Sequence, residues 1–151
     1  MLKKEKPNKL EGIEMTNRLE AVKINVKIKL SALWVTVMFL YLYVDVFANY
    51  IPGRLEDLIA GELGGVPITQ EFLLAFMILM TIPSLMVFLS LTLKAKANRW
   101  TNIIVGILYL GVVLVSIIGD SNYFYIFGSS VEVVLLLLIV WHAWKWPKQP
   151  R

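Results

Sequence analysis

Long apolar runs separated by short polar segments dominate the pattern along this chain. Four of the runs reach about twenty residues, and a helix of that length crosses the ~30 Å hydrocarbon core of a bilayer. The pattern predicts an all-α bundle of four transmembrane helices, with spans at residues 30–51, 72–93, 100–119 and 123–146. They form one membrane domain over residues 30–147, flanked by basic tails at residues 1–29 and 148–151.

The connections between the spans predict their arrangement. In the first connection, GRLEDLIAGEL separates apolar from charged positions at helical spacing, which predicts a short amphipathic helix at the outer membrane surface. Thr69 is expected to cap the second helix, with Glu71 in its first turn. The basic segment KAKANR and the segment DSN are read as short turns. Short turns predict that the second, third and fourth spans are sequential antiparallel neighbours.

Proline and glycine positions predict features inside the spans. Pro83 lies within the second span, where it removes one backbone hydrogen bond and is expected to kink the helix. The hydroxyl of Thr81 or Ser84 is expected to satisfy the freed carbonyl. Gly106 and Gly111 are expected to let the third helix approach a neighbour closely.

The N-terminal tail is mixed in charge, and its first part is expected to be disordered. Before the first span, VKINVKIKL alternates apolar and polar residues, which is typical of a strand. A lone strand has no ladder partner, so an extended or helical lead-in lying on anionic lipid headgroups is the favoured interpretation.

Composition and charge agree with a membrane protein. The chain is 58% hydrophobic with a mean hydropathy of +0.67, which is too apolar for an ordinary soluble domain. There is no cysteine, which excludes disulfides, thiolate catalysis and cysteine-based metal sites. The net charge is +4, but the basic residues flank apolar runs instead of forming a nucleic-acid face. The expected partners are therefore the bilayer and anionic headgroups, and not nucleic acid.

The distribution of charge predicts the orientation. Every Lys and Arg except Arg54 falls in residues 1–29, in KAKANR or at the C-terminal end in residues 145–151. The positive-inside rule then predicts a multi-pass protein of the cell membrane with both termini in the cytoplasm. Five tryptophans are expected near the cytoplasmic side, as an interfacial belt: Trp34, Trp100, Trp141, Trp144 and Trp146.

Two carboxylates within the spans are the candidate site. Asp45 and Glu132 are expected about 9 Å and about 13 Å from the outer ends of their helices. If the first and fourth helices touch, the carboxylates could face each other, and two close acids cannot both stay ionised. This arrangement favours a proton-sharing pair or a cation site. The full candidate set is Asp45, Asn49, Glu132, Tyr41 and Ser129, with Ser130 as a further member. The alternative is that both acids only hydrogen-bond to neighbouring helices.

Motifs for enzymatic chemistry are missing from the sequence. There is no P-loop, GxGxxG, HExxH or GxSxG pattern. His142 is the only histidine, and it lies among tryptophans, where interfacial packing is the simpler interpretation. We therefore predict no catalytic, cofactor-binding or metal-binding residue.

Four segments carry a resemblance to a known group of proteins: KIKLSALW, VPITQEFLL, LKAKANRWTNIIVG and VWHAWKWP. On these segments the chain resembles an uncharacterised family of small four-helix prokaryotic integral membrane proteins, classed as a domain of unknown function. The resemblance touches most of residues 27–147 and leaves the N-terminal tail outside. It implies four spans and no known activity. A looser similarity to DoxX-like membrane proteins rests on helix count alone.

Three functions are compatible with these observations. The leading interpretation is a non-enzymatic accessory subunit or homo-oligomer of the membrane. The second is binding or transport of a small ligand, cation or proton through the polar site in the outer half of the bundle. Four spans are few for a complete transporter, so transport would need oligomerisation or a membrane partner. A quinone-linked membrane oxidoreductase comes third.

Overall fold

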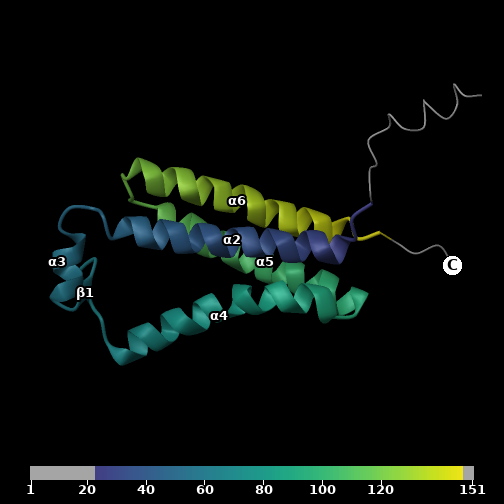
Figure 1. The fold of residues 1–151 in the computed structure, drawn as a ribbon, viewed down its shortest axis with the longest axis horizontal. Helices are drawn as coiled ribbons and strands as arrows, with labels where there is room; N and C mark the ends of the chain where they lie inside the picture. The colour runs from purple at the N-terminus through teal and green to yellow at the C-terminus, as the bar shows by residue number, and fades with distance from the viewer. Residues whose placement is uncertain (1–22, 148–151) are drawn as a thin grey trace, which may run out of the picture.

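The computed structural model describes residues 23–147 and is built almost entirely from helices (Figure 1). The long helices are α2 (Val26–Ala48), α4 (Gln70–Thr92), α5 (Ala95–Ile117) and α6 (Tyr123–Trp144). Each of these four is long and apolar enough to cross a membrane. The predicted all-α fold with four such helices is confirmed. The disorder expected for the N-terminal tail concerns residues outside the described range.

The four helices do not pack evenly around one axis. Helix α2 packs against both α4 and α6, and α5 packs mainly against α6. Helix α4 contacts α2 far more than it contacts α5, although only a tight turn joins α4 to α5. In Figure 1, the C-terminal end of α4 lies beside the start of α5 at the turn, and the two helices diverge toward the end that holds α3 and β1. The prediction that the second and third spans are close neighbours is therefore wrong for most of their length.

Helix α2 starts within the alternating segment. Asn25 is its N-cap, and the Asn25 side chain accepts a hydrogen bond from the Lys27 amide at 2.9 Å. The Lys27 ammonium group donates to the carbonyls of Leu91 and Leu93 at 3.1 and 2.7 Å, at the C-terminus of α4. A lysine there satisfies carbonyls that the helix end leaves unpaired. From Val26 on the segment is helical, so the period-two pattern does not mark a strand.

The long connection after α2 holds a short helix and a small hairpin. The predicted helix is present as α3 (Arg54–Ile59), and its apolar side chains Leu55 and Ile59 are exposed. Strands β1 (Glu62–Leu63) and β2 (Val66–Pro67) pair antiparallel after it. Gly64 and Gly65 join the strands with φ angles of 58° and 79°. Two adjacent residues with positive φ form the two-residue turn that favours glycine, a signal that the sequence analysis missed.

The segment KAKANR belongs mostly to a helix and not to a turn. Helix α5 starts at Ala95, directly after its N-cap Lys94. Alanine is the strongest helix former, and two alanines stand in this segment. The predicted start near residue 100 is therefore too late. The expected Thr69 cap is confirmed, since the Thr69 side chain accepts from the Phe72 amide at 3.2 Å.

Pro83 lies inside α4, and the carbonyl that it leaves without a helical donor belongs to Leu79. The Tyr109 hydroxyl of α5 donates a hydrogen bond to this carbonyl. The predicted donors bond elsewhere, because Thr81 and Ser84 donate to the carbonyls of Met77 and Met80 at 2.7 and 2.8 Å. The prediction of a donor within the same helix is thus wrong, because a tyrosine from the neighbouring helix fills the gap.

We expect Tyr109→Phe to lower the free energy of unfolding by about 1 kcal/mol, because the Leu79 carbonyl loses its donor in a region without water. Pro83→Ala restores a backbone N–H that can reach the same carbonyl. Tyr109→Phe should therefore cost clearly less in the Pro83→Ala background, as measured by a double-mutant cycle in detergent-induced unfolding. An equal cost in both backgrounds would show that the hydroxyl does not replace the missing helical bond.

A buried polar cluster holds the other end of the bundle together. It consists of Trp34, Ser90, Asn98 and Asn102, all of which are fully buried. The Trp34 indole N–H donates to the Asn102 side-chain oxygen at 2.7 Å, and the Ser90 hydroxyl donates to the same oxygen at 3.2 Å. The side-chain amide of Asn98 donates to the Ser90 carbonyl at 2.5 Å. Trp34 is therefore a core residue joining α2 to α5.

Candidate functional site

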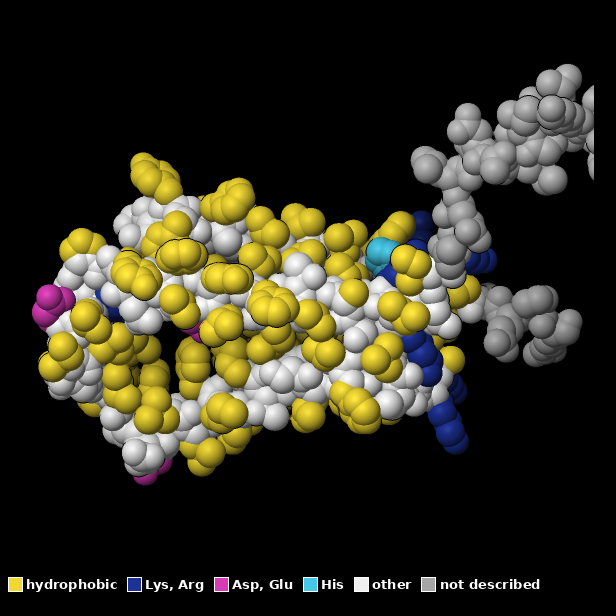
Figure 2. Space-filling view, viewed as in Figure 1, with side chains coloured by type: hydrophobic (Ala, Val, Ile, Leu, Met, Phe, Trp, Pro, Cys, Tyr) yellow, Lys and Arg dark blue, Asp and Glu magenta, His cyan; other side chains and the backbone are white. Residues whose placement is uncertain are grey.

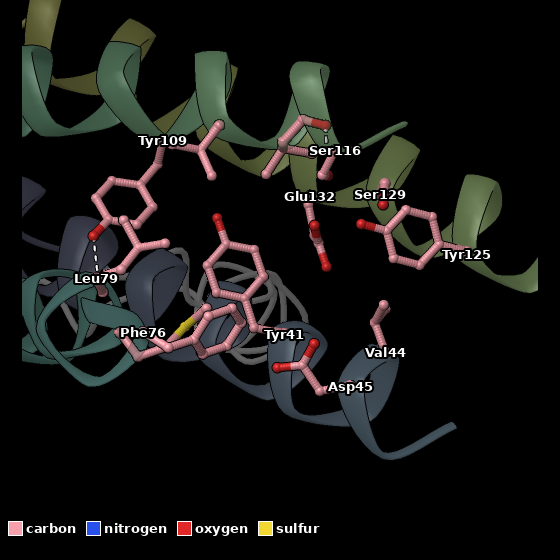
Figure 3. A pocket seen from close by; sticks show the side chains of 13 residues that line it. Tyr41, Val44, Asp45, Phe76, Leu79, Tyr109, Ser116, Tyr125, Ser129 and Glu132 are labelled. Carbon is pink, nitrogen blue, oxygen red and sulfur yellow. Dashed lines mark hydrogen bonds between the residues drawn. The ribbon is translucent and has the colours of Figure 1, made fainter. Parts of the chain in front are cut away.

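A cavity of about 200 Å³ lies between all four long helices (Figure 3). It lies in the part of the bundle where α4 diverges, since the buried residues of α4 are Pro83, Met86 and Ser90, all in its second half. Valine, leucine and methionine side chains form much of the wall. The polar groups of the wall are Tyr41, Asp45, Tyr109, Ser116, Tyr125, Ser129 and Glu132.

Close contact between α2 and α6 sets one side of this cavity. A Cβ atom at Gly128 would lie 2.6 Å from the Val44 Cγ2 atom, so only glycine fits here at the present helix separation. The sequence analysis assigned close approach to Gly106 and Gly111. Gly106 does lie against Val140 of α6, but nothing stands within 4 Å of a Cβ at Gly111.

Glu132 is the deepest acid in the described part of the chain. Its side chain is 3% exposed, and its Oε1 atom is buried without a hydrogen-bond partner. It shares its helix face with Ser129, which is also buried and lines the cavity. The hydroxyl of Tyr41, on α2, is a second buried polar group without a partner. Both groups belong to the wall of the cavity, which therefore holds unsatisfied hydrogen-bonding capacity.

Asp45 lies one turn after Tyr41 on α2 and lines the same cavity as Glu132. Unlike Glu132 it is exposed at the surface of the protein, so it stands at the mouth of the cavity. The structure thus brings together four of the five predicted site residues, Tyr41, Asp45, Ser129 and Glu132. The first and fourth of the long helices, α2 and α6, are in contact, as the predicted pairing of the two acids requires.

Two of the candidate residues lie away from the cavity. Asn49 is the C-cap of α2 and is exposed, so the structure does not add it to the cavity wall. Ser130 is exposed as well, and its hydroxyl donates to the Ile126 carbonyl at 2.6 Å. Asn49 has the spacing to share a face with Tyr41 and Asp45, but α2 ends at Ala48, so Asn49 lies at the end of the helix beyond the cavity. Ser130 lies beside the buried face of α6.

Of the aromatic residues in the site, only Tyr41 was predicted from the sequence. The cavity wall holds one aromatic residue from each long helix: Tyr41 of α2, Phe76 of α4, Tyr109 of α5 and Tyr125 of α6. Tyr125 was within reach of the sequence, since it precedes Glu132 by seven residues and shares its helix face. Phe76 and Tyr109 were not, because their inclusion depends on how α4 and α5 pack.

Arg54 lies in a separate depression at the same end of the bundle. Its neighbours in the wall of that depression include Asp57, Asp120 and Tyr125. Within residues 23–147 it is the only Lys or Arg at this end. It does not line the cavity of Glu132, so the two buried hydrogen-bonding groups of that cavity face no basic side chain in its wall.

A family model matches residues 19–150. The chain belongs to the family of unknown function DUF6326. This confirms the resemblance to an uncharacterised family, and the DUF6326 match also covers residues 19–26, which the resemblance left out. No curated protein and no solved structure matches the chain. The looser similarity to DoxX-like proteins finds no support in these comparisons.

The described part of this DUF6326 chain contains no group of three histidine, aspartate or glutamate side chains that could hold a metal ion. His142 stands at the opposite end of α6 from the cavity. Its Nδ1 atom lies 2.8 Å from the Leu138 carbonyl, and its ring packs edge-on against Trp141. The cavity with its two carboxyl groups is therefore the candidate site of the DUF6326 chain.

Proposed function

We propose that this chain is a multi-pass membrane protein that binds a small positively charged ligand in the cavity between α2, α4, α5 and α6. The observation that carries the proposal is Glu132. Its carboxyl group is buried in the cavity wall, and one oxygen has no hydrogen-bond partner. An unpaired buried polar group costs about 1–3 kcal/mol, and more if it is charged. A cation beside Glu132 would remove that cost.

The surface of the protein supports placement in a membrane. Large apolar side chains are exposed along the outer faces of the long helices, for example Phe39, Leu74, Ile104 and Val115. Figure 2 shows such side chains over the flanks, with Lys and Arg gathered at the end where α2 begins and α6 ends. This distribution supports a cytoplasmic location for both termini, and it leaves α3 and the cavity in the outer half. The exposed Leu55 and Ile59 suit a helix resting at the outer interface.

Single cysteines will test this orientation, because the chain contains none. Ser121→Cys, between α5 and α6, should react with a membrane-impermeant maleimide added to intact cells. Lys96→Cys, in the first turn of α5, should react only after the membrane is permeabilised. The reverse pattern would overturn the orientation, and labelling of both positions in intact cells would overturn the membrane placement of α5.

The two acids suit different steps of binding. Asp45 at the mouth can attract a cation, while Glu132 inside can accept its hydrogen bonds or neutralise its charge. Carboxyl groups within a span are costly in lipid, which favours a functional role for this pair. Neither the accessory-subunit interpretation nor the oxidoreductase interpretation gains support from this geometry, and both stay predictions.

Native mass spectrometry of the gently solubilised protein tests the proposal. We expect a defined extra mass on the wild-type protein that disappears in the double variant Asp45→Asn, Glu132→Gln. Glu56→Gln, on α3, is the matched control and should keep the extra mass, because Glu56 lies outside the cavity wall. The same spectrum gives the oligomeric state. An extra mass that persists in the double variant would contradict a role for the two acids.

A further inference from the structure

We propose that the ligand is a small organic ammonium ion, held with its charge beside Glu132 and its carbon substituents against aromatic rings. This inference rests on the proposed function and names the ligand class of the same cavity. It starts from the aromatic wall. One ring comes from each long helix, and in Figure 3 Tyr41 and Tyr125 lie on either side of Glu132. Aromatic faces around a negative charge are the usual means by which proteins recognise alkylammonium ions.

The donor set argues against a hard metal cation. Calcium takes six to eight oxygen ligands and magnesium takes six in octahedral geometry. In this cavity, the Tyr109 hydroxyl donates to the Leu79 carbonyl and the Ser116 hydroxyl donates to the Val113 carbonyl at 2.9 Å. The oxygen atoms that remain belong to the two carboxyl groups and to the hydroxyl groups of Tyr41, Tyr125 and Ser129. All of them come from α2 and α6, and the side of the cavity formed by α4 and α5 is mostly apolar. An alkylammonium ion needs a counter-charge but no full shell of oxygen atoms.

The size of the cavity limits the ligand. An engineered protein cavity of about 150 Å³ admits benzene. At about 200 Å³, this cavity admits a molecule slightly larger than one ring, and not a drug-sized compound. A trimethylammonium group meets this limit, and one further substituent such as a benzyl group can extend toward the open side of the cavity.

The opening of the cavity also suits an organic cation with apolar substituents. The first half of α4 contributes no buried residue, and it diverges from α2 and α5 (Figure 1). The surface is hollowed between α4 and the rest of the bundle (Figure 2). This opening lies on the flank of the helices, which in the proposed orientation faces the outer leaflet. An organic cation with apolar substituents can enter from the lipid side at a lower free-energy cost than an inorganic ion, which holds its hydration water more strongly.

Equilibrium binding of radiolabelled benzyltrimethylammonium to the full chain in lipid nanodiscs tests the inference. We expect saturable binding at one site. Neopentylbenzene, which has carbon in place of the charged nitrogen, should compete at least tenfold more weakly. Glu132→Gln should weaken binding at least tenfold, and Glu56→Gln should leave it unchanged. Tyr125→Leu should weaken binding several-fold more than Tyr125→Phe, which keeps the ring.

Parallel binding of ²²Na⁺ separates the two proposals. If benzyltrimethylammonium does not bind but ²²Na⁺ binds and is lost in Glu132→Gln, the ammonium inference is overturned and the proposed cation site stands. If neither cation binds to a Glu132→Gln-sensitive site, or neopentylbenzene binds as tightly as the ammonium ion, both proposals are overturned. Circular dichroism and gel filtration of each variant exclude loss of folding as the cause of lost binding.

Discussion

Replacing Trp34 with alanine is expected to lower the free energy of unfolding by about 3–5 kcal/mol, which is the usual cost of deleting a buried aromatic side chain. Trp34 is fully buried, and its ring packs edge-on against Tyr109 at 6.4 Å between centroids. Its indole N–H is one of two donors to the Asn102 side-chain oxygen. Truncation therefore leaves a void between α2 and α5 and removes one bond of the buried cluster. Detergent-induced unfolding, followed by circular dichroism, measures the loss.

Two further variants separate packing from hydrogen bonding. Trp34→Phe keeps a ring, and Ser90 still donates to Asn102, so its cost should be smaller, with about 1 kcal/mol from the lost bond. Trp141→Ala removes a tryptophan that is 50% exposed, and it should cost less than about 1 kcal/mol. If Trp34→Ala proved no more costly than Trp141→Ala, the buried cluster would not be what holds this end of the bundle closed.

The two ends of the helix bundle differ in how tightly the helices pack. At the end with Trp34, buried hydrogen bonds join α2, α4 and α5. At the other end α4 stands apart, and the cavity with Glu132 opens beside it. Polar bonds between helices persist in lipid because water cannot replace them. The closed end therefore holds α2, α4 and α5 together, while the cavity end lacks such bonds to the first half of α4.

The sequence predicted the helices better than it predicted their packing. Hydropathy identifies a span whatever its neighbours are, so all four long helices followed from it. The predicted ends of the helices depended on capping and helix-forming residues, which are not equally easy to recognise. Thr69 was recognised as a cap, whereas KAKANR was read as a turn because its charges hid two helix-forming alanines. The separation of α4 from α5 could not be predicted from the hydropathy pattern. Two helices joined by a short turn can either pack side by side or diverge.

The site residues that could be predicted are those whose position follows from spacing within a single helix. Tyr41 and Asp45 follow from spacing on α2, and Ser129 and Glu132 follow from spacing on α6. Groups that meet only through packing were missed. The Tyr109 hydroxyl reaches the Leu79 carbonyl, which lies thirty positions earlier in the sequence and which Pro83 leaves without a helical donor. No periodicity links the two helices. The burial of Trp34 could not be predicted either, because its acceptor, Asn102, lies on another helix.

Gly128→Ala is expected to lower the free energy of unfolding by about 1–3 kcal/mol, the usual cost of overpacking. The added Cβ would stand 2.6 Å from the Val44 Cγ2 atom. Valine in a helix is restricted to one preferred rotamer, so its methyl group cannot swing aside and α2 must separate from α6. Glu132 lies one turn further along α6, so the same separation should also weaken binding of benzyltrimethylammonium.

Val44→Ala provides the decisive test of this contact, because it removes the methyl group that the new Cβ would meet. The double variant Gly128→Ala, Val44→Ala should be more stable than the sum of the two single losses predicts, by about 1 kcal/mol or more. Gly111→Ala is the matched control, since a Cβ there meets nothing within 4 Å. Alanine is favoured over glycine inside a helix by about 1 kcal/mol, so this control should be neutral or stabilising. Additive losses in the double variant would mean that Gly128 is not required for close contact between α2 and α6, and the cavity would then owe its shape to the divergence of α4 alone.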